Sequence, residues 1–171
     1  MDSQSSSMKK DSPPLTTSTG WKKRAARDIE NLQKNGFPVQ FEKEDDMSSI
    51  ITFTHGPSDS PYEGYSWQIR FTIPDGYPFS SPSVGFIQRI YHPNVDEESG
   101  SICLDALNKN WSPSFNLKHI VEVLIPYLLS YPNPDDPLNR EAAALLKQNK
   151  SAFEALAKDY ARTHGLKKKK S

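Results

Sequence analysis

Short runs of strand-forming residues, separated by turns rich in glycine and proline, most constrain the fold of this chain. Four such runs occur, at residues 39–41, 50–53, 67–73 and 84–90. In the clearest of them, residues 67–73, apolar and polar side chains alternate, which places the apolar ones on one face of a β-strand. The connections are short, so neighbouring strands are expected to pair as an antiparallel meander. One face of this sheet must be covered, and the predicted helices are the candidates.

Four segments have helical patterns, and they cover residues 21–34, 117–129, 139–147 and 151–164. In the first segment the apolar residues recur on one face, as in a helix that packs against a core. Ser18 or Thr19 is expected to cap this helix, and Gly36 supplies its stop. The sequence therefore predicts an N-terminal helix before the strands and three helices after them.

Two of the later helices carry local signals of where they bend, begin or end. The helix at residues 117–129 is almost entirely apolar and is expected to be buried on most sides. Pro126 removes a backbone donor inside it and predicts a kink or a break near residues 122–126. In the last helix, Ser151 and Glu154 have capping-box spacing, and Gly165 follows the end.

These elements predict one α+β domain with an N-terminal helix, a four-stranded antiparallel β-meander, a central buried helix and C-terminal helices. The domain is assigned to residues 19–165, and 171 residues suffice for one domain with a real core. Residues 1–18, rich in serine, threonine and proline, are expected to be a disordered extension. Residues 166–171 form a basic tail, interpreted as a frayed solubilising end or as a handle for nuclear import or an acidic partner.

Charge and cysteine content exclude several functional classes. The chain has 21 basic and 21 acidic residues, so no net field attracts nucleic acid or an anionic membrane. No apolar run is long enough to span a bilayer, and the N-terminus lacks a signal-peptide core. The single cysteine excludes an internal disulfide, and the scattered histidines lack metal-ligand spacing. We therefore expect a cytoplasmic or nuclear protein without a metal or another cofactor.

The single cysteine, Cys103, lies at the end of a loop whose sequence suits an exposed thiol. A Pro-Asn pair opens the loop, an acidic run keeps it solvated, and Gly100 permits a positive φ. Asn94 lies nine residues before Cys103, and this spacing allows its amide to donate to an oxygen developing on a carbon bonded to the sulfur. The alternative, from the local sequence alone, is that Cys103 is a small buried hydrophobic residue.

Four motifs decide between these interpretations, and they are His92-Pro93-Asn94, Ile102-Cys103-Leu104-Asp105, Trp111-Ser112-Pro113 and the segment from Tyr131 to Leu138 with its Pro-Asp-Asp-Pro centre. In this order and spacing they resemble the ubiquitin-conjugating enzymes, from about Trp21 to His164. The loop before Cys103 is one residue longer than in the commonest members, and one more residue precedes Pro132. Both features look most like the ubiquitin-conjugating enzyme H group.

The resemblance implies a catalytic set of Cys103, Asn94 and Asp136. Cys103 would accept ubiquitin from an activating enzyme as a thioester and pass it to a lysine amine. Asp136 would orient that amine, and Asn94 would either stabilise the oxyanion or hold the active-site loop. His92 would be structural. Asp105 would tune the local charge or be an ordinary exposed acid.

The resemblance also implies partners. It assigns Lys22, Lys23 and Arg24 to the activating-enzyme surface, although a solvated helix face explains them equally well. Phe79, Pro113 and Ser114 match the loops that RING-type ligases grip, and the alternative for Phe79 is the core. The H group further implies protein substrates that include histones, and the chain is expected to be a monomer. Two rival functions are a carrier of another ubiquitin-like modifier and a non-catalytic adaptor of the same fold.

Overall fold

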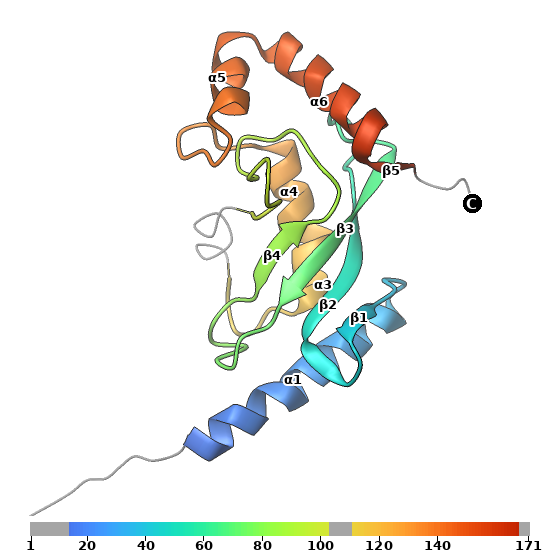
Figure 1. Ribbon diagram of the computed structural model, residues 1–171, viewed down its shortest axis with the longest axis vertical. Helices are drawn as coiled ribbons and strands as arrows, with labels where there is room; N and C mark the ends of the chain where they lie inside the picture. Colours follow the sequence, from blue (N-terminus) through green and yellow to red (C-terminus); the bar gives the residue numbers. More distant parts are fainter. Residues whose placement is uncertain (1–13, 103–110, 168–171) are drawn as a thin grey trace, which may run out of the picture.

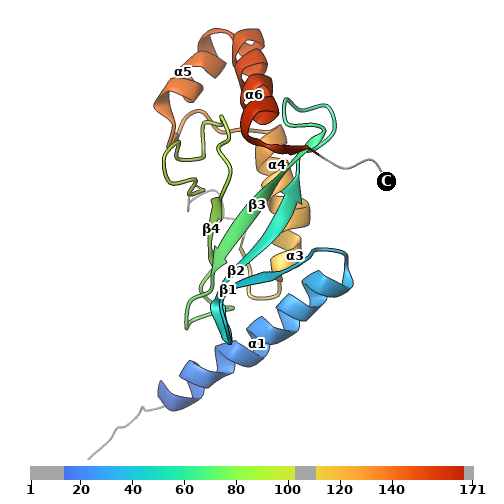
Figure 2. The same cartoon turned by 45° about the vertical axis from the view of Figure 1, so that its right-hand side comes forward.

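The computed structural model of the chain describes residues 14–102 and 111–167 (Figure 1). The elements follow in the order α1 (Pro14–Lys34), β1 (Gln40–Lys43), β2 (Asp46–His55), β3 (Tyr65–Thr72), β4 (Ser83–Phe86), α3 (Leu117–His119), η1 (Ile120–Leu124), α4 (Ile125–Ser130), α5 (Arg140–Gln148), α6 (Lys150–His164) and β5 (Leu166–Lys167). The predicted α+β class is confirmed. α1 crosses one end of the sheet, α5 and α6 lie at the other end, and α3, η1 and α4 cover one face (Figures 1 and 2).

The sheet is the predicted antiparallel meander, with the strand order β1-β2-β3-β4. β4 ends at Phe86, before the residues up to 90 that the sequence pattern included. The short strand β5 adds to β3, where Lys167 pairs with Tyr65 and Leu166 pairs with Ser66. This pairing corrects the expected domain boundary, because the first two residues assigned to the free tail belong to the sheet.

The core lies between the sheet and the helical layer α3-η1-α4. Trp67, Ile69 and Phe71 of β3 are fully buried, which confirms the alternation read from the sequence. Burial of each such side chain contributes about 1.5–3 kcal/mol. A buried hydrogen bond also joins the sheet to the helical layer, since the Thr54 hydroxyl of β2 donates to the Val121 carbonyl of η1 at 2.8 Å.

Helix α1 begins at Pro14, so the expected caps at Ser18 and Thr19 lie inside the helix. A proline at the first position is compatible with a helix, because its missing N–H would have no partner there. Gly36, with φ of 87°, ends the helix region as predicted. Of the residues assigned to the disordered extension, 1–13 lie outside the described residues and 14–18 are helical.

The predicted disturbance before Pro126 is a wide π-helical turn at Ile120–Leu124. The Ile125 N–H donates to the Ile120 carbonyl, five residues earlier. The helix therefore accommodates Pro126, which has no N–H donor, by a wider turn and does not break. The expectation of burial on most sides is wrong for the outer face. Val123 and Tyr127 are 44% and 63% exposed.

The two C-terminal helices begin at asparagine caps. The Asn139 side chain accepts from the Ala142 N–H at 3.0 Å, at the predicted start of α5. In α6 the cap is Asn149, which accepts from the Ala152 N–H at 3.1 Å, so the predicted capping box at Ser151 is wrong. Gly165 ends α6 as predicted. None of the helices in the described ranges is both long and apolar enough to cross a bilayer.

Candidate functional site

Asn94 joins the loop that leads toward Cys103 to the proline-rich loop before α5. Its side chain is buried, with 1% exposure. The amide nitrogen donates to the backbone carbonyls of Asn133, at 2.8 Å, and Asp136, at 3.3 Å. The amide oxygen accepts from the Asn133 N–H at 2.8 Å. Donor and acceptor are therefore both used in holding the two loops together.

The His92 side chain joins the Asn94 backbone to α4. Its Nδ1 accepts from the Asn94 backbone N–H at 3.0 Å, and Nε2 lies 2.8 Å from the Leu128 carbonyl in α4. This pattern requires the neutral tautomer with the proton on Nε2. Complete burial lowers the pKa of His92 to about 4, against a smaller raising effect of the Leu128 carbonyl. The structural role expected for His92 agrees with these contacts.

Backbone hydrogen bonds complete the junction. The Pro93 carbonyl accepts from the N–H groups of Leu138 and Asn139, both at 2.9 Å. The proline-rich loop is thus fixed at both ends, by Asn94 near its start and by Pro93 near its end. Asn133 and Leu138 contribute backbone atoms to this junction, and backbone groups carry no residue-type signal that a sequence pattern could reveal.

The two acids of the Pro-Asp-Asp-Pro segment have different environments. Asp135 forms an ion pair with Lys147 of α5, at 3.0 Å between carboxylate and ammonium. Asp136 has its backbone carbonyl bound by Asn94, and the residue is exposed. The structure therefore joins the Asn94 side chain to the Asp136 backbone. Asp136 lies at the surface, within reach of a partner from solution.

The cysteine loop is fixed against β4 up to the residue before Cys103. The Ile102 N–H donates to the Val84 carbonyl at 3.1 Å, and the Phe86 N–H donates to the Gly100 carbonyl at 2.8 Å. Gly100 has φ of 78°, and a Cβ there would lie 2.0 Å from the Phe86 carbonyl oxygen, so only glycine fits. Cys103 and Asp105 lie outside the described residues.

The two expected ligase loops lie side by side and present exposed tips. Phe79 is 82% exposed, so the alternative that it belongs to the core is wrong. Pro113 and Ser114 are also exposed. The Trp111 indole N–H donates to the Pro78 carbonyl at 2.8 Å, and this bond holds one loop against the other.

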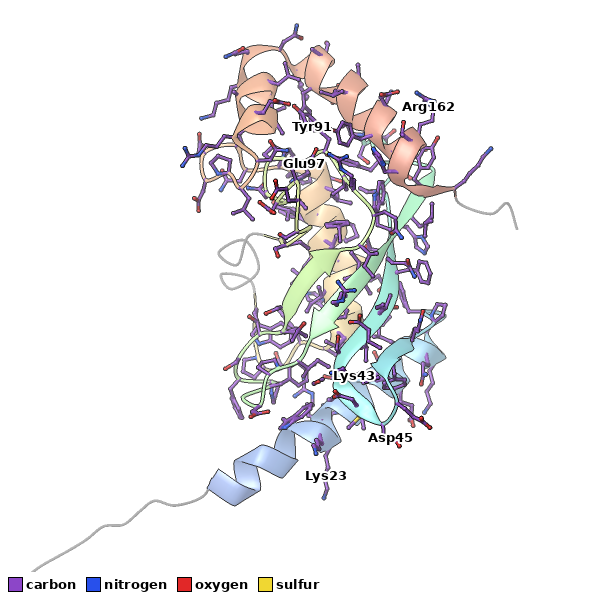
Figure 3. The ribbon with its side chains drawn as sticks, in the orientation of Figure 1. Lys23, Lys43, Asp45, Tyr91, Glu97 and Arg162 are labelled. Carbon is purple, nitrogen blue, oxygen red and sulfur yellow. The ribbon has the colours of Figure 1, made fainter. Side chains whose placement is uncertain are left out.

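The cations at the start of α1 divide into two kinds. Lys22 and Lys23 are exposed, and Figure 3 shows Lys23 directed away from the body of the protein. Arg24 turns inward, and its guanidinium bonds to buried Asp28 at 2.9 Å and to the Phe115 carbonyl. The assignment of Arg24 to a docking surface is therefore corrected, since its charge is used inside the fold, in the link between α1 and the Trp111 loop.

An exposed aromatic face lies on the helix that leads into the proline-rich loop. Tyr127 and Tyr131 are 63% and 66% exposed, and their ring centroids are 4.9 Å apart. Val123 extends this face by one turn. Contiguous exposed apolar side chains mark protein-docking surfaces. Their spacing of four residues was present in the sequence, but the apolar character of the whole helix concealed which side faced solvent.

Within the described part of the chain, no three histidine, cysteine, aspartate or glutamate side chains are grouped to hold a metal ion. The site consists of the loop that leads to Cys103, the buried Asn94 that joins this loop to the proline-rich loop, and the exposed Asp136 on the latter. Such an arrangement suits nucleophilic carrier chemistry at the thiol, followed by attack of an incoming group beside the acid.

Comparison with known proteins gives consistent matches. The family model described as ubiquitin-conjugating enzyme matches residues 22–161. Ubiquitin-conjugating enzyme E2 6 of Arabidopsis thaliana is 47% identical over 138 residues, which cover 81% of this chain and 75% of the relative. Ubiquitin-conjugating enzyme E2-24 kDa of Saccharomyces cerevisiae is 42% identical over 148 residues, 86% of this chain and 67% of the relative. The solved E2 domain of a Toxoplasma gondii ubiquitin-conjugating enzyme superposes with a TM-score of 0.76 at 30% identity, over 84% of this chain and 98% of that one.

Proposed function

The chain belongs to the ubiquitin-conjugating enzyme family, and from that premise we propose that Cys103 carries ubiquitin and that Asp136 orients the amine that receives it. Ubiquitin, an activating enzyme and a ligase are the partners that this family works with. The observation that carries the residue assignment is the Asn94 side chain, which binds the loop of Asp136 to the loop that leads to Cys103.

The first step exchanges one thioester for another. The Cys103 thiolate attacks the carbonyl carbon of ubiquitin on the activating enzyme, a new C–S bond forms, and the activating enzyme's thiolate leaves. A free thiol with a pKa of about 8.5 is already a few per cent ionised at neutral pH, so a dedicated base is unnecessary.

The second step forms an amide with a lysine amine and releases the Cys103 thiol. A lysine with a pKa of about 10.4 is neutral in only about one molecule in two or three thousand at pH 7, so its orientation matters. A carboxylate favours the ammonium form, and Asp136 therefore serves by accepting a hydrogen bond that aligns the amine. In this scheme Asn94 holds the loop of Asp136, because its amide donors are already bonded to the Asn133 and Asp136 carbonyls.

A charging assay tests the role of Cys103. Incubation with activating enzyme, ATP and ubiquitin should give an adduct that a reducing agent removes, and Cys103→Ser should give a reductant-resistant oxygen ester or no adduct. Serine keeps the size of the side chain, so misfolding would not explain the change. A reductant-sensitive adduct on Cys103→Ser, or none on the wild type with any modifier, would refute the proposal.

The same assay with a panel of ubiquitin-like modifiers addresses the rival functions. Preferential charging with ubiquitin is expected. Charging with another modifier alone would establish the rival carrier, and ligase binding by an uncharged wild type would favour an adaptor.

Phe79→Ala should weaken stimulation by a RING-type ligase about tenfold, because an 82% exposed aromatic at a loop tip is a typical anchor for a partner. Charging without ligase should be unchanged. The measurement is the ligase concentration at half-maximal discharge of the thioester. Phe41→Ala, on exposed strand β1, is the matched control, and equal losses in both variants would contradict a specific ligase site at Phe79. We assign Pro113 and Ser114 to the same surface.

Several finer features belong to the same proposal. Lys22 and Lys23, exposed on α1, would meet the activating enzyme. The long cysteine loop and the extra residue before Pro132 support membership of the H group, with histones among the substrates. The family match at residues 22–161 falls within the predicted domain, whose end the β5 pairing extends to residue 167, and we propose that this domain acts as a monomer in the cytoplasm or nucleus.

A further inference from the structure

Glu97 connects the cysteine loop to the C-terminal helix. It lies in the acidic run of that loop, six residues before Cys103. Its Oε1 accepts hydrogen bonds from the Arg89 guanidinium and from the Tyr160 hydroxyl, both at 2.9 Å. Tyr160 belongs to α6, far along the chain from the loop. Arg89, Glu97 and Tyr160, called the loop clamp below, therefore join the loop to a separate part of the fold.

The helix side of the loop clamp is held by aromatic packing. The ring of Tyr160 packs on that of Tyr91, with centroids 5.1 Å apart, and the Arg89 guanidinium lies over the Tyr160 ring at 5.7 Å. Tyr91 is buried, and its carbonyl accepts from the Tyr62 hydroxyl at 2.6 Å. Figure 3 shows Tyr91 and Glu97 close together beneath α5 and α6. The core thus fixes where the Tyr160 hydroxyl points.

The loop side has internal bonds that give it shape. The Asp96 N–H donates to the Ser101 carbonyl, and the Gly100 N–H donates to the Asp96 carbonyl, both at 2.9 Å. These bonds shape the loop, and the bonds to β4 hold its last residues, whereas the Glu97 carboxylate joins its acidic part to α6. The charge balance also favours the clamp, because three consecutive carboxylates at residues 96–98 repel one another and Arg89 offsets part of that repulsion.

We propose that Arg89 and Tyr160 are positioning residues that act through Glu97 to hold the cysteine loop in the orientation from which ubiquitin is transferred to lysine. This inference rests on the proposed role of Cys103. It makes the C-terminal helix α6 part of the catalytic framework, although no residue of α6 needs to touch the reacting atoms.

Tyr160→Phe tests the inference, because it removes the hydroxyl and keeps the stacked ring. The purified ubiquitin thioester is mixed with increasing concentrations of free lysine in single-turnover reactions. The maximal discharge rate should fall about three- to tenfold, since a hydrogen bond to a carboxylate is among the stronger ones. The lysine concentration at half-maximal rate should not change, because the loop clamp does not contact the amine.

Two further variants keep the test decisive. Glu97→Ala, which removes the acceptor of both bonds, should show at least as large a loss, and the double variant Tyr160→Phe with Glu97→Ala should discharge no more slowly than Glu97→Ala alone, since both changes remove the same interaction. Tyr65→Phe is the matched control, because the Tyr65 hydroxyl has no hydrogen bond within the described residues. Amide hydrogen exchange at Asp96 and Gly100 should accelerate in Tyr160→Phe.

Different results would overturn different claims. A wild-type discharge rate in Tyr160→Phe, or multiplying losses in the double variant, would reject the loop clamp as a positioning device. A lower melting temperature with unchanged discharge would assign these residues to stability alone. Absence of a thioester on the wild type would instead refute the proposed function, and the two failures are therefore distinguishable.

Discussion

Asn94→Ala should slow transfer of ubiquitin to lysine by about two orders of magnitude and leave charging of Cys103 largely intact. The structural reason is that Asn94 makes three hydrogen bonds to the proline-rich loop, and alanine makes none of them. A shift of the order of 1 Å at a positioning group can reduce a rate about a hundredfold. Charging depends less on this loop, because thioester exchange needs an accessible thiolate and no oriented amine.

The stability of Asn94→Ala should also fall, by roughly 3 kcal/mol. Asn94 is 1% exposed, and its substitution removes three partly buried hydrogen bonds to Asn133 and Asp136, each worth about 0.5–1.5 kcal/mol. Urea denaturation gives this value, and the discharge experiment is then done well below the unfolding midpoint. Asn133→Ala is the matched control. It removes an exposed side chain whose oxygen accepts from the Asp135 N–H at 3.1 Å but retains the backbone N–H and carbonyl that Asn94 binds, so only a small effect is expected.

A change of nucleophile separates loop holding from oxyanion stabilisation. Hydroxylamine is largely unprotonated at neutral pH and needs little alignment by Asp136. If Asn94 acts by holding the loop of Asp136, Asn94→Ala should discharge to hydroxylamine at nearly the wild-type rate. An oxyanion role predicts the same loss with lysine and hydroxylamine, because both reactions pass through the same tetrahedral oxyanion. Equal losses would therefore reject the interpretation drawn from the Asn94 hydrogen bonds.

The fold followed from local patterns where burial was the deciding force. Alternation in β3 predicted which side chains are buried, and Pro126 predicted the irregular helical turn before it. Both effects depend on residues that are close together in the sequence. Helix ends were less predictable. Ser151 and Asn149 both have capping side chains, and only the actual course of the chain after α5 decides that Asn149 is the cap.

The candidate site shows the same division. The resemblance implied a catalytic set that includes Asn94 and Asp136, and in the structure the Asn94 amide donates to the Asp136 backbone carbonyl. The inward turn of Arg24 depends on Asp28 one helical turn away and on the carbonyl of Phe115, 91 residues further on. The bond between Glu97 and Tyr160 spans 63 residues. The four-residue spacing of Arg24 and Asp28 is local, but the contacts with Phe115 and Tyr160 are set by tertiary packing, which no local spacing predicts.

Lowering the pH from 7.5 to 4.5 should destabilise the protein by about 2–3 kcal/mol through His92 alone. The unfolded imidazole has its ordinary pKa of about 6.5, whereas burial lowers that of folded His92 to about 4. Between these values the unfolded chain binds a proton that the folded chain excludes, and each pKa unit corresponds to about 1.4 kcal/mol. The contribution is fully present above about pH 6.5 and is lost as the pH falls toward 4.

Urea denaturation at several pH values measures this slope. His92→Gln should be less stable at pH 7.5 but should lose less stability on acidification, because its amide retains one donor and one acceptor and does not titrate. His119→Gln, at a half-buried position of α3, shows whether loss of any imidazole flattens the slope, and equal flattening in both variants would contradict the assignment to His92. Titration of Asp96 does not contribute to the slope in this pH range. Its pKa is lowered by the hydrogen bond from the Ser99 N–H, so its contribution is lost only at still lower pH.

Protonation of His92 also reaches the candidate site. The added proton on Nδ1 would face the Asn94 backbone N–H, 3.0 Å from that nitrogen in the structure, and two donors cannot share a hydrogen bond. Amide exchange at Asn94 should therefore accelerate over the same pH range as the loss of stability in the wild type, but not in His92→Gln. If amide exchange at Asn94 did not change with pH while the stability fell, the loss of stability would come from protonation of another group. The interpretation that neutral His92 holds the Asn94 backbone would then be wrong.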